Sequence, residues 1–217
     1  MSRAGFAFAQ ARLHAHLAQR LEESDWQILE TSRDFGHCLD VASRMTIGPA
    51  IAHLTRDSDP HRVEQVLHAN WITRVDQIAG WVPLAWQEAT RSIAALPQLR
   101  TGSNGLSKET PAQDSAQEWL DTWQAQMPDQ RLFAPLRLAL APILSRYLGG
   151  GADLPTSGRL ASWPDLAHTL LQVFRKQAQS PAAILAYLGL AALDYERLRG
   201  VLSAKSIFAG PAPAGGA

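Results

Sequence analysis

The sequence lacks several features that mark common functional classes. Cys38 is the single cysteine among 217 residues, which excludes an internal disulfide and a zinc site built from cysteines. Charged residues make up 18% of the chain, less than the usual quarter, and 20 Lys and Arg balance 20 Asp and Glu. Such a neutral chain lacks the basic footprint of nucleic-acid-binding proteins and the charge that would dock it on anionic lipid.

Long apolar runs and cofactor motifs are missing as well. No stretch approaches the roughly 20 apolar residues of a membrane span, and the first residues lack the pattern of a secretory signal. We therefore expect a cytoplasmic protein with no direct membrane insertion, peripheral to a membrane only through a protein complex. No phosphate loop, GxSxG or HExxH motif occurs, so no cofactor and no metal site is predicted.

Helical periodicity is what the sequence does have. Asp34 and Asp59-Pro60 are typical helix starts, and apolar residues follow each at steps of three and four. A first helix is expected over about Phe6 to Leu21, Gly48-Pro49 is expected to interrupt a helix, and Pro164 to open one. No segment alternates as a strand does, so the predicted fold is an all-α multi-helix bundle.

One segment without periodicity suggests how the chain is organised. Residues 97–111, PQLRTGSNGLSKETP, are rich in turn formers. They form either a long surface loop or a linker between an N-terminal helical subdomain, 1–96, and a C-terminal one, 112–208. The tail, 209–217, has nothing to bury and is expected to be disordered.

The side chains that could carry chemistry are dispersed. His14 and His16 point to nearly opposite sides of a helix, and Cys38 lies on an apolar face, where a small buried hydrophobe is expected. Trp119 and Trp123 share a helix face and serve either the core or an interface. A helical enzyme would need His53, His61 or His68 to converge on a carboxylate in a polar pocket.

The most informative stretch is SPAAILAYLGLAALDYERLRGVLSAK, from Ser180 to Lys205. Ser180 suits an N-cap and Pro181 the first helical position, while Glu196 and Arg199 can pair one turn apart. Ile184 and Leu188 begin an apolar stripe that continues to Leu202 on one face. The pattern predicts a packed helix with a charged end.

This helix resembles the C-terminal helix of the C/d subunits of V-type and archaeal-type rotary ATPases. Tyr187-Leu188 fills that family's tyrosine–leucine pair, and Asp194 stands at its glutamate. Leu198, Arg199 and Lys205 also match, whereas Arg197 replaces an asparagine and Ala204 a glycine. Near the start, Phe6 and Phe8 precede Ala11-Arg12, in the family's order. The chain is a divergent and shortened match.

The resemblance implies a non-catalytic subunit that couples the central stalk to the proteolipid ring, with both as protein partners. It assigns six residues to the family framework or an interface: Arg12, Tyr187, Asp194, Leu198, Arg199 and Lys205. The alternative is a stand-alone helical adaptor, derived from that family, that binds another protein. Neither hypothesis includes catalysis or nucleic-acid binding.

Overall fold

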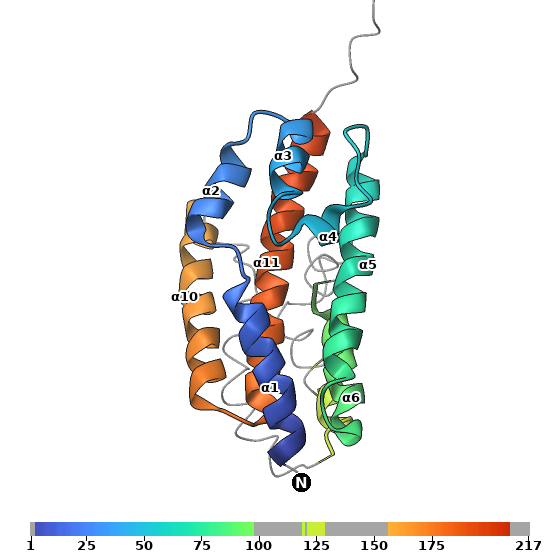
Figure 1. Cartoon of the computed structure of the whole chain (residues 1–217), viewed down its shortest axis with the longest axis vertical. Helices are drawn as coiled ribbons and strands as arrows, with labels where there is room; N and C mark the ends of the chain where they lie inside the picture. The colour runs from blue at the N-terminus through green and yellow to red at the C-terminus, as the bar shows by residue number, and fades with distance from the viewer. Residues whose placement is uncertain (1–2, 98–118, 120, 129–155, 209–217) are drawn as a thin grey trace, which may run out of the picture. The chain divides into compact units, whose positions relative to one another are not determined.

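The computed structural model describes residues 3–97, 119, 121–128 and 156–208. Every regular element in these residues is helical, which confirms the predicted all-α class. In chain order (Figure 1) the elements are α1 (Arg3–Ala18), α2 (Glu23–Thr31), α3 (Phe35–Ala42), α4 (Gly48–Ile51), α5 (Pro60–Ala79), α6 (Leu84–Arg91), the 3-10 helix η1 (Ser92–Ala95), α10 (Thr156–Lys176) and α11 (Pro181–Phe208).

Local sequence signals set several helix starts. The side chain of Asp34 accepts a hydrogen bond from the backbone N–H of His37 at 2.8 Å, at the start of α3. The side chain of Asp59 accepts one from the N–H of Arg62 at 2.7 Å, at the start of α5. Each carboxylate satisfies an N–H that has no partner within its helix, so both predicted starts are confirmed.

Other helix boundaries differ from the expected ones. Helix α1 begins at Arg3 and ends at Ala18, earlier at both ends than predicted. Gly48-Pro49 begins the short α4, because proline is well tolerated in a first helical turn. Helix α10 begins at Thr156 and continues through Pro164, where one backbone hydrogen bond is missing. Apolar residues from Leu132 to Tyr147 also recur at helical steps and predict a further helix, but these residues lie outside the described ones.

The chain divides into two compact units that are not contiguous in sequence. Unit 1 comprises Met1–Leu13 and Val75–Leu193, and unit 2 comprises His14–Arg74 and Asp194–Ala217. The sequence predicted that 97–111 is either a long surface loop or a linker between two contiguous subdomains. Most of this segment, 98–111, lies outside the described residues, as does the tail 209–217. That boundary stays a prediction.

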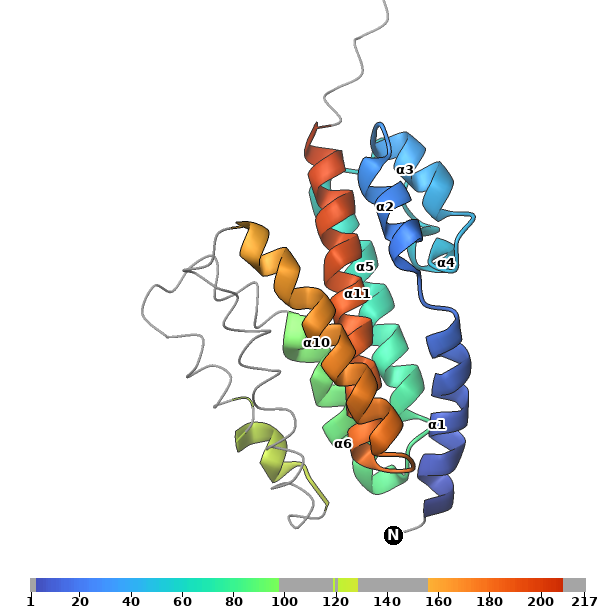
Figure 2. The same cartoon turned by 90° about the vertical axis from the view of Figure 1, so that its left-hand side faces the viewer.

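In unit 1, the first part of α11 is buried on all sides. Every residue from Ala182 to Leu188 is buried, whereas the sequence predicted one apolar stripe. A helix that is apolar all round is typical of a buried position. Helix α10 lies alongside it (Figure 2): the rings of Phe174 and Tyr187 are 6.3 Å apart, and Leu170 packs at Gly189.

The turn between α10 and α11 is tied to α1. Gln179 has a φ of 59°, and its backbone N–H donates to the side-chain oxygen of the buried Gln10 on α1. The hydroxyl of Ser180 donates to the carbonyl of Gln177 at 2.6 Å. The serine hydroxyl therefore binds the end of α10, while the carbonyl of Ser180 accepts a hydrogen bond from the N–H of Ala183 at 3.2 Å, at the start of α11.

Tryptophans fill much of the rest of this unit. Trp86 on α6 meets Phe6 of α1 edge to face, with ring centroids 5.8 Å apart. Trp123 is buried, and its indole N–H donates to the carbonyl of Ala89 at 2.8 Å. Trp119 stacks on Trp123 at 5.4 Å, as their shared helix face predicted. Trp86 and Trp123 are thus core residues.

Unit 2 has its own core, formed by α2 to α4, the first part of α5 and the end of α11. Cys38 is completely buried in it, as the sequence predicted, and burial raises the pKa of its thiol. The buried members are Trp26, Leu29, Phe35, Cys38, Leu39, Ala42, Ile51, Leu54, Val63, Val66, Leu67, Leu198 and Leu202.

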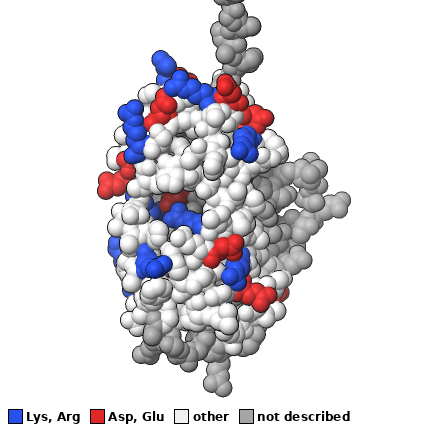
Figure 3. Space-filling view, turned by 45° about the vertical axis from the view of Figure 1, so that its right-hand side comes forward, with Lys and Arg blue, Asp and Glu red and all other residues white. Residues whose placement is uncertain are grey.

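Charges of both signs lie interspersed between wide uncharged areas on the face in Figure 3. None of the helices in the described part of the chain is both long enough and apolar enough to cross a membrane.

Candidate functional site

The charged end of α11 is bound within unit 2 by a set of ion pairs. Arg20, in the segment between α1 and α2, binds Asp194 with two hydrogen bonds of 2.7 Å each. Arg20 Nε donates to Oδ2 and Nη2 donates to Oδ1, so the pair is bidentate. About four-fifths of the Arg20 side chain and three-quarters of the Asp194 side chain are shielded from water. Such paired, charge-assisted bonds are among the strong ones in proteins.

One turn further on, Arg197 connects α11 to α2. Its Nη1 and Nη2 donate to the two carboxylate oxygens of Glu23 at 2.8 and 2.7 Å, and its Nε donates to Glu30 at 2.8 Å. The guanidinium also lies 4.9 Å from the ring centroid of Trp26. The hydrogen bond from Arg197 is the main cause that lowers the pKa of Glu23, and the bond to Glu23 in turn raises the pKa of Arg197. The guanidinium of Arg197 thus binds α2 in two ways, through hydrogen bonds to Glu23 and Glu30 and through its contact with the ring of Trp26.

Lys205 completes this contact at the far end of α2. Its ammonium donates to the backbone carbonyl of Ser32 at 2.6 Å and to that of Glu30 at 3.1 Å. The last carbonyls of a helix have no partner within it and favour a cation. Lys205 therefore acts as a C-terminal cap for α2. We call Arg20, Asp194, Arg197, Glu23, Glu30 and Lys205 the α11 clasp.

A second group of ionisable residues lies where α11 meets α5. Arg199 contacts Glu196 at 3.1 Å, the i,i+3 pair expected from the sequence, and Glu64 of α5 at 3.7 Å. Tyr195 packs on Trp71 at 5.8 Å between centroids. Burial, followed by the nearby Glu64, raises the pKa of Tyr195 to about 12, so the phenol stays neutral.

The two remaining framework residues on α11 are apolar contacts. Leu198 belongs to the core of unit 2. Tyr187 is buried in unit 1 against Phe174. The structure therefore gives Tyr187, Asp194, Leu198, Arg199 and Lys205 contacts inside the protein, in two different units.

Arg12 differs from all of these because it faces outward. Its guanidinium lies 4.7 Å from the ring centroid of Phe8 and 5.2 Å from that of Trp81, all within unit 1. Arg12 is exposed and so is Phe8. The contact between Arg12 and Phe8 follows from their i,i+4 spacing on α1. The contact between Arg12 and Trp81 was not predicted.

The three histidines that an enzyme would need lie at or near the surface, and His68 on α5 is half-buried. His53 and His61 are exposed, and the ring of His61 lies 2.9 Å from the amide nitrogen of Gln65 on the same helix. Among the described residues, no three His, Cys, Asp or Glu side chains gather closely enough to hold a metal ion.

Sequence reasoning missed the partners of the α11 clasp. Arg20 carries no motif, and only the seven-residue spacing of Glu23 and Glu30, which places both on one face of α2, could have marked that pair. Comparison of the chain with protein-family models, curated proteins and solved structures finds no match.

Proposed function

We propose that this chain is a non-catalytic helical subunit that works by binding other proteins. The observation that carries the proposal is the exposure of large apolar side chains on its helices. In unit 1, Leu84 at the start of α6 is 83% exposed and Phe8 on α1 is 53% exposed. In unit 2, the last two residues of α11, Ile207 and Phe208, are also exposed.

Large apolar side chains that are exposed on helices can be buried by a partner protein, which favours a complex. Burying one such side chain in a partner contributes roughly 1.5–3 kcal/mol. Aromatic residues also supply much of the binding energy at interfaces. The α11 clasp supports this role, because ion pairs that fix a helix keep a binding surface in one shape.

The more specific form of the proposal is a rotor subunit like the C/d subunit of rotary ATPases. Such a subunit would sit on the cytoplasmic side, hold the central stalk and contact the proteolipid ring. Its supports are the sequence matches at Tyr187, Asp194, Leu198, Arg199 and Lys205. Transmission of torque needs fixed helices, and the contacts of Asp194 and Lys205 are of the kind that fixes them.

A stand-alone adaptor is the second candidate, and one observation favours it. Arg197 stands where the family has asparagine, and it binds Glu23 and Glu30 together. An asparagine is too short and uncharged to form these ion pairs. Holding α2 through ion pairs of its own is what we expect of an adaptor that derives from that family and no longer belongs to its complex.

Cross-linking in the native host, followed by purification of the tagged full chain, tests both forms. Recovery of proteolipid and stalk subunits supports the rotor, and recovery of an unrelated protein supports the adaptor. Leu84→Glu should reduce either yield, whereas Arg62→Ala, a change at another exposed position, should leave it unchanged. If the chain is recovered alone, the proposed function is wrong.

A further inference from the structure

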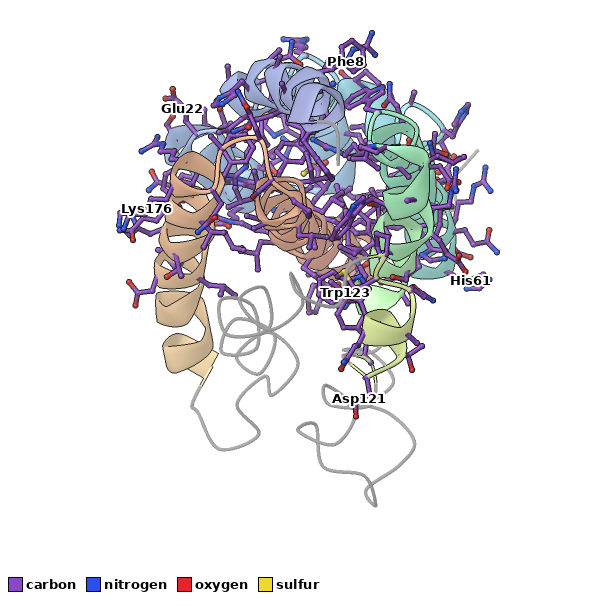
Figure 4. All side chains as sticks on the ribbon, turned by 90° about the horizontal axis from the view of Figure 1, so that it is seen from below. Phe8, Glu22, His61, Asp121, Trp123 and Lys176 are labelled. Atoms are coloured by element: carbon purple, nitrogen blue, oxygen red, sulfur yellow. The ribbon has the colours of Figure 1, made fainter. Side chains whose placement is uncertain are left out.

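Two exposed side chains of unit 1, Phe8 and Arg12, form an aromatic–arginine cluster with the half-buried Trp81. Phe8 and Arg12 lie one turn apart on α1, and Trp81 follows the end of α5. The Arg12 guanidinium lies over both rings, at 4.7 and 5.2 Å from their centroids. Figure 4 shows Phe8 on the outer side of α1, directed away from the other helices.

The cluster continues toward the start of α6. Gly5 of α1 lies so close to Pro83 that an added Cβ would come within 2.9 Å of the proline ring. Residues 5 to 12 of α1 therefore lie beside residues 81 to 83, and the highly exposed Leu84 follows directly. We call Phe8, Arg12, Trp81 and Leu84 the α1–α6 patch.

The charge of Arg12 has no counterpart in the described part of the chain. No carboxylate there pairs with it, whereas Arg20, Arg197 and Arg199 each bind at least one. Helix α1 contains no Asp or Glu at all. The nearest acidic position along α6 is Glu88, and Asp76 of α5 is bound to Arg91.

Among the residues that the structure describes, none accepts a hydrogen bond from the N–H groups of Arg12. A guanidinium that stacks on aromatic rings uses its flat faces, and its five N–H groups lie in the plane of the group, where they can still bind a partner. A carboxylate is the partner whose two oxygens match that edge. Two rings already restrict the side chain, so less conformational entropy is lost when a carboxylate binds.

We propose that the α1–α6 patch binds a segment of a partner protein in which an Asp or Glu stands beside a large apolar side chain. The carboxylate binds the edge of Arg12, and the apolar side chain packs on Phe8 and Leu84. This inference rests on the proposed protein-binding function and specifies its partner. A nucleic acid or anionic membrane would require several cations, and this patch supplies one guanidinium.

Site-specific photo-cross-linking with the full chain tests the proposal. Phe8→p-benzoyl-phenylalanine places the photoreactive group in the patch, and the same replacement at Ile28, exposed to a similar degree in unit 2, is the matched control. Cross-linking is done in the native host, and the linked partner peptide is identified by mass spectrometry. We expect position 8 to capture a peptide that contains an acidic residue next to an apolar one, at a yield at least tenfold above position 28.

The second step tests the role of the charge. Arg12→Glu should lower the yield at position 8 about tenfold or more, and Asp or Glu→Arg in the captured peptide should restore it. Arg12→Lys, which keeps the charge without the planar fork, should give an intermediate yield. Far-UV circular dichroism confirms that each variant is folded. Because Arg12 is exposed, we expect both Arg12 variants to fold.

Several results would overturn the inference. These are a peptide without a carboxylate, a second copy of this chain, lipid or nucleic acid at position 8, equal capture from position 28, or no effect of Arg12→Glu. If the tagged chain recovers a protein partner but position 8 does not capture it, this inference fails and the proposed function stands. If no protein partner is recovered by either method, the proposed function itself fails.

Discussion

Arg20 and Asp194 lie 174 positions apart in the chain and are joined by two parallel hydrogen bonds of 2.7 Å. The pair ties the segment after α1 to α11 within unit 2. Because both side chains are mostly shielded from water, loss of either charge leaves its partner poorly solvated. The pair is therefore expected to contribute more to stability than the exposed ion pairs of this protein.

Asp194→Asn should lower the free energy of unfolding by about 1–3 kcal/mol, because Arg20 then loses its charged acceptor. Urea denaturation followed by circular dichroism measures the change. Asp40→Asn is the matched control, since the Arg56–Asp40 pair is largely exposed and should cost less than about 1 kcal/mol. Equal losses in the two variants would contradict the assigned importance of the shielded pair.

The stability of unit 2 should depend on the ionisation of Glu23. Its pKa is lowered in the folded state by the hydrogen bond from Arg197, so this contribution is complete above the ordinary value of 4.5 and is lost as the pH falls through the lowered folded value. Glu23→Gln should thus be less stable than the natural protein at pH 7. The difference should shrink as the pH falls below 4.5, as measured by denaturation at a series of pH values. A difference that does not change with pH would mean that the Arg197 contact does not depend on the charge of Glu23.

Two neighbouring aspartates should differ in their effect on α5. Asp59→Ala removes the acceptor for the N–H of Arg62 and should lower the free energy of unfolding by about 1 kcal/mol. Asp57→Ala, two residues earlier and exposed, should change it far less. Thermal denaturation of both variants checks the comparison, and a larger loss at Asp57 would show that Asp59 is not the effective cap.

Two glycines of α11 offer a comparison of packing. An added Cβ at Gly200 meets no atom within 4 Å, so Gly200→Ala should stabilise the helix by roughly 0.5–1 kcal/mol. At Gly189 the Cβ would lie 3.0 Å from a methyl group of Leu170, which is buried. Gly189→Ala should therefore stabilise less than Gly200→Ala or destabilise. The reverse order of melting temperatures would show that Leu170 moves aside freely.

The parts of the fold that the sequence predicts are those that local chemistry determines. Asp34 and Asp59 begin helices because a carboxylate binds N–H groups three residues on, a relationship contained in a few residues. The i,i+3 pair of Glu196 and Arg199 and the stacking of Trp119 on Trp123 are equally local. For the same reason, the all-α class followed from periodicity alone.

The parts that sequence reasoning missed depend on contacts between distant segments. Asp194 was singled out by a resemblance, but nothing local indicates that Arg20 is its partner. Gln179 adopts a positive φ where glycine would be expected, because Gln10 of α1 accepts its N–H. Likewise, the outward position of Arg12 depends on Trp81, about seventy residues further along the chain.

Reactivity of the Cys38 thiol tests most directly the central claim that charged residues of α11 hold unit 2 together. Cys38 is buried in the same core as Trp26, on which Arg197 packs, so a thiol reagent reaches it only when this core opens. Arg197→Ala should raise the labelling rate under native conditions roughly 5- to 30-fold, which corresponds to about 1–2 kcal/mol, while Arg62→Ala leaves it unchanged. An unchanged rate in Arg197→Ala would contradict the claim and leave the α11 clasp without a role in stability.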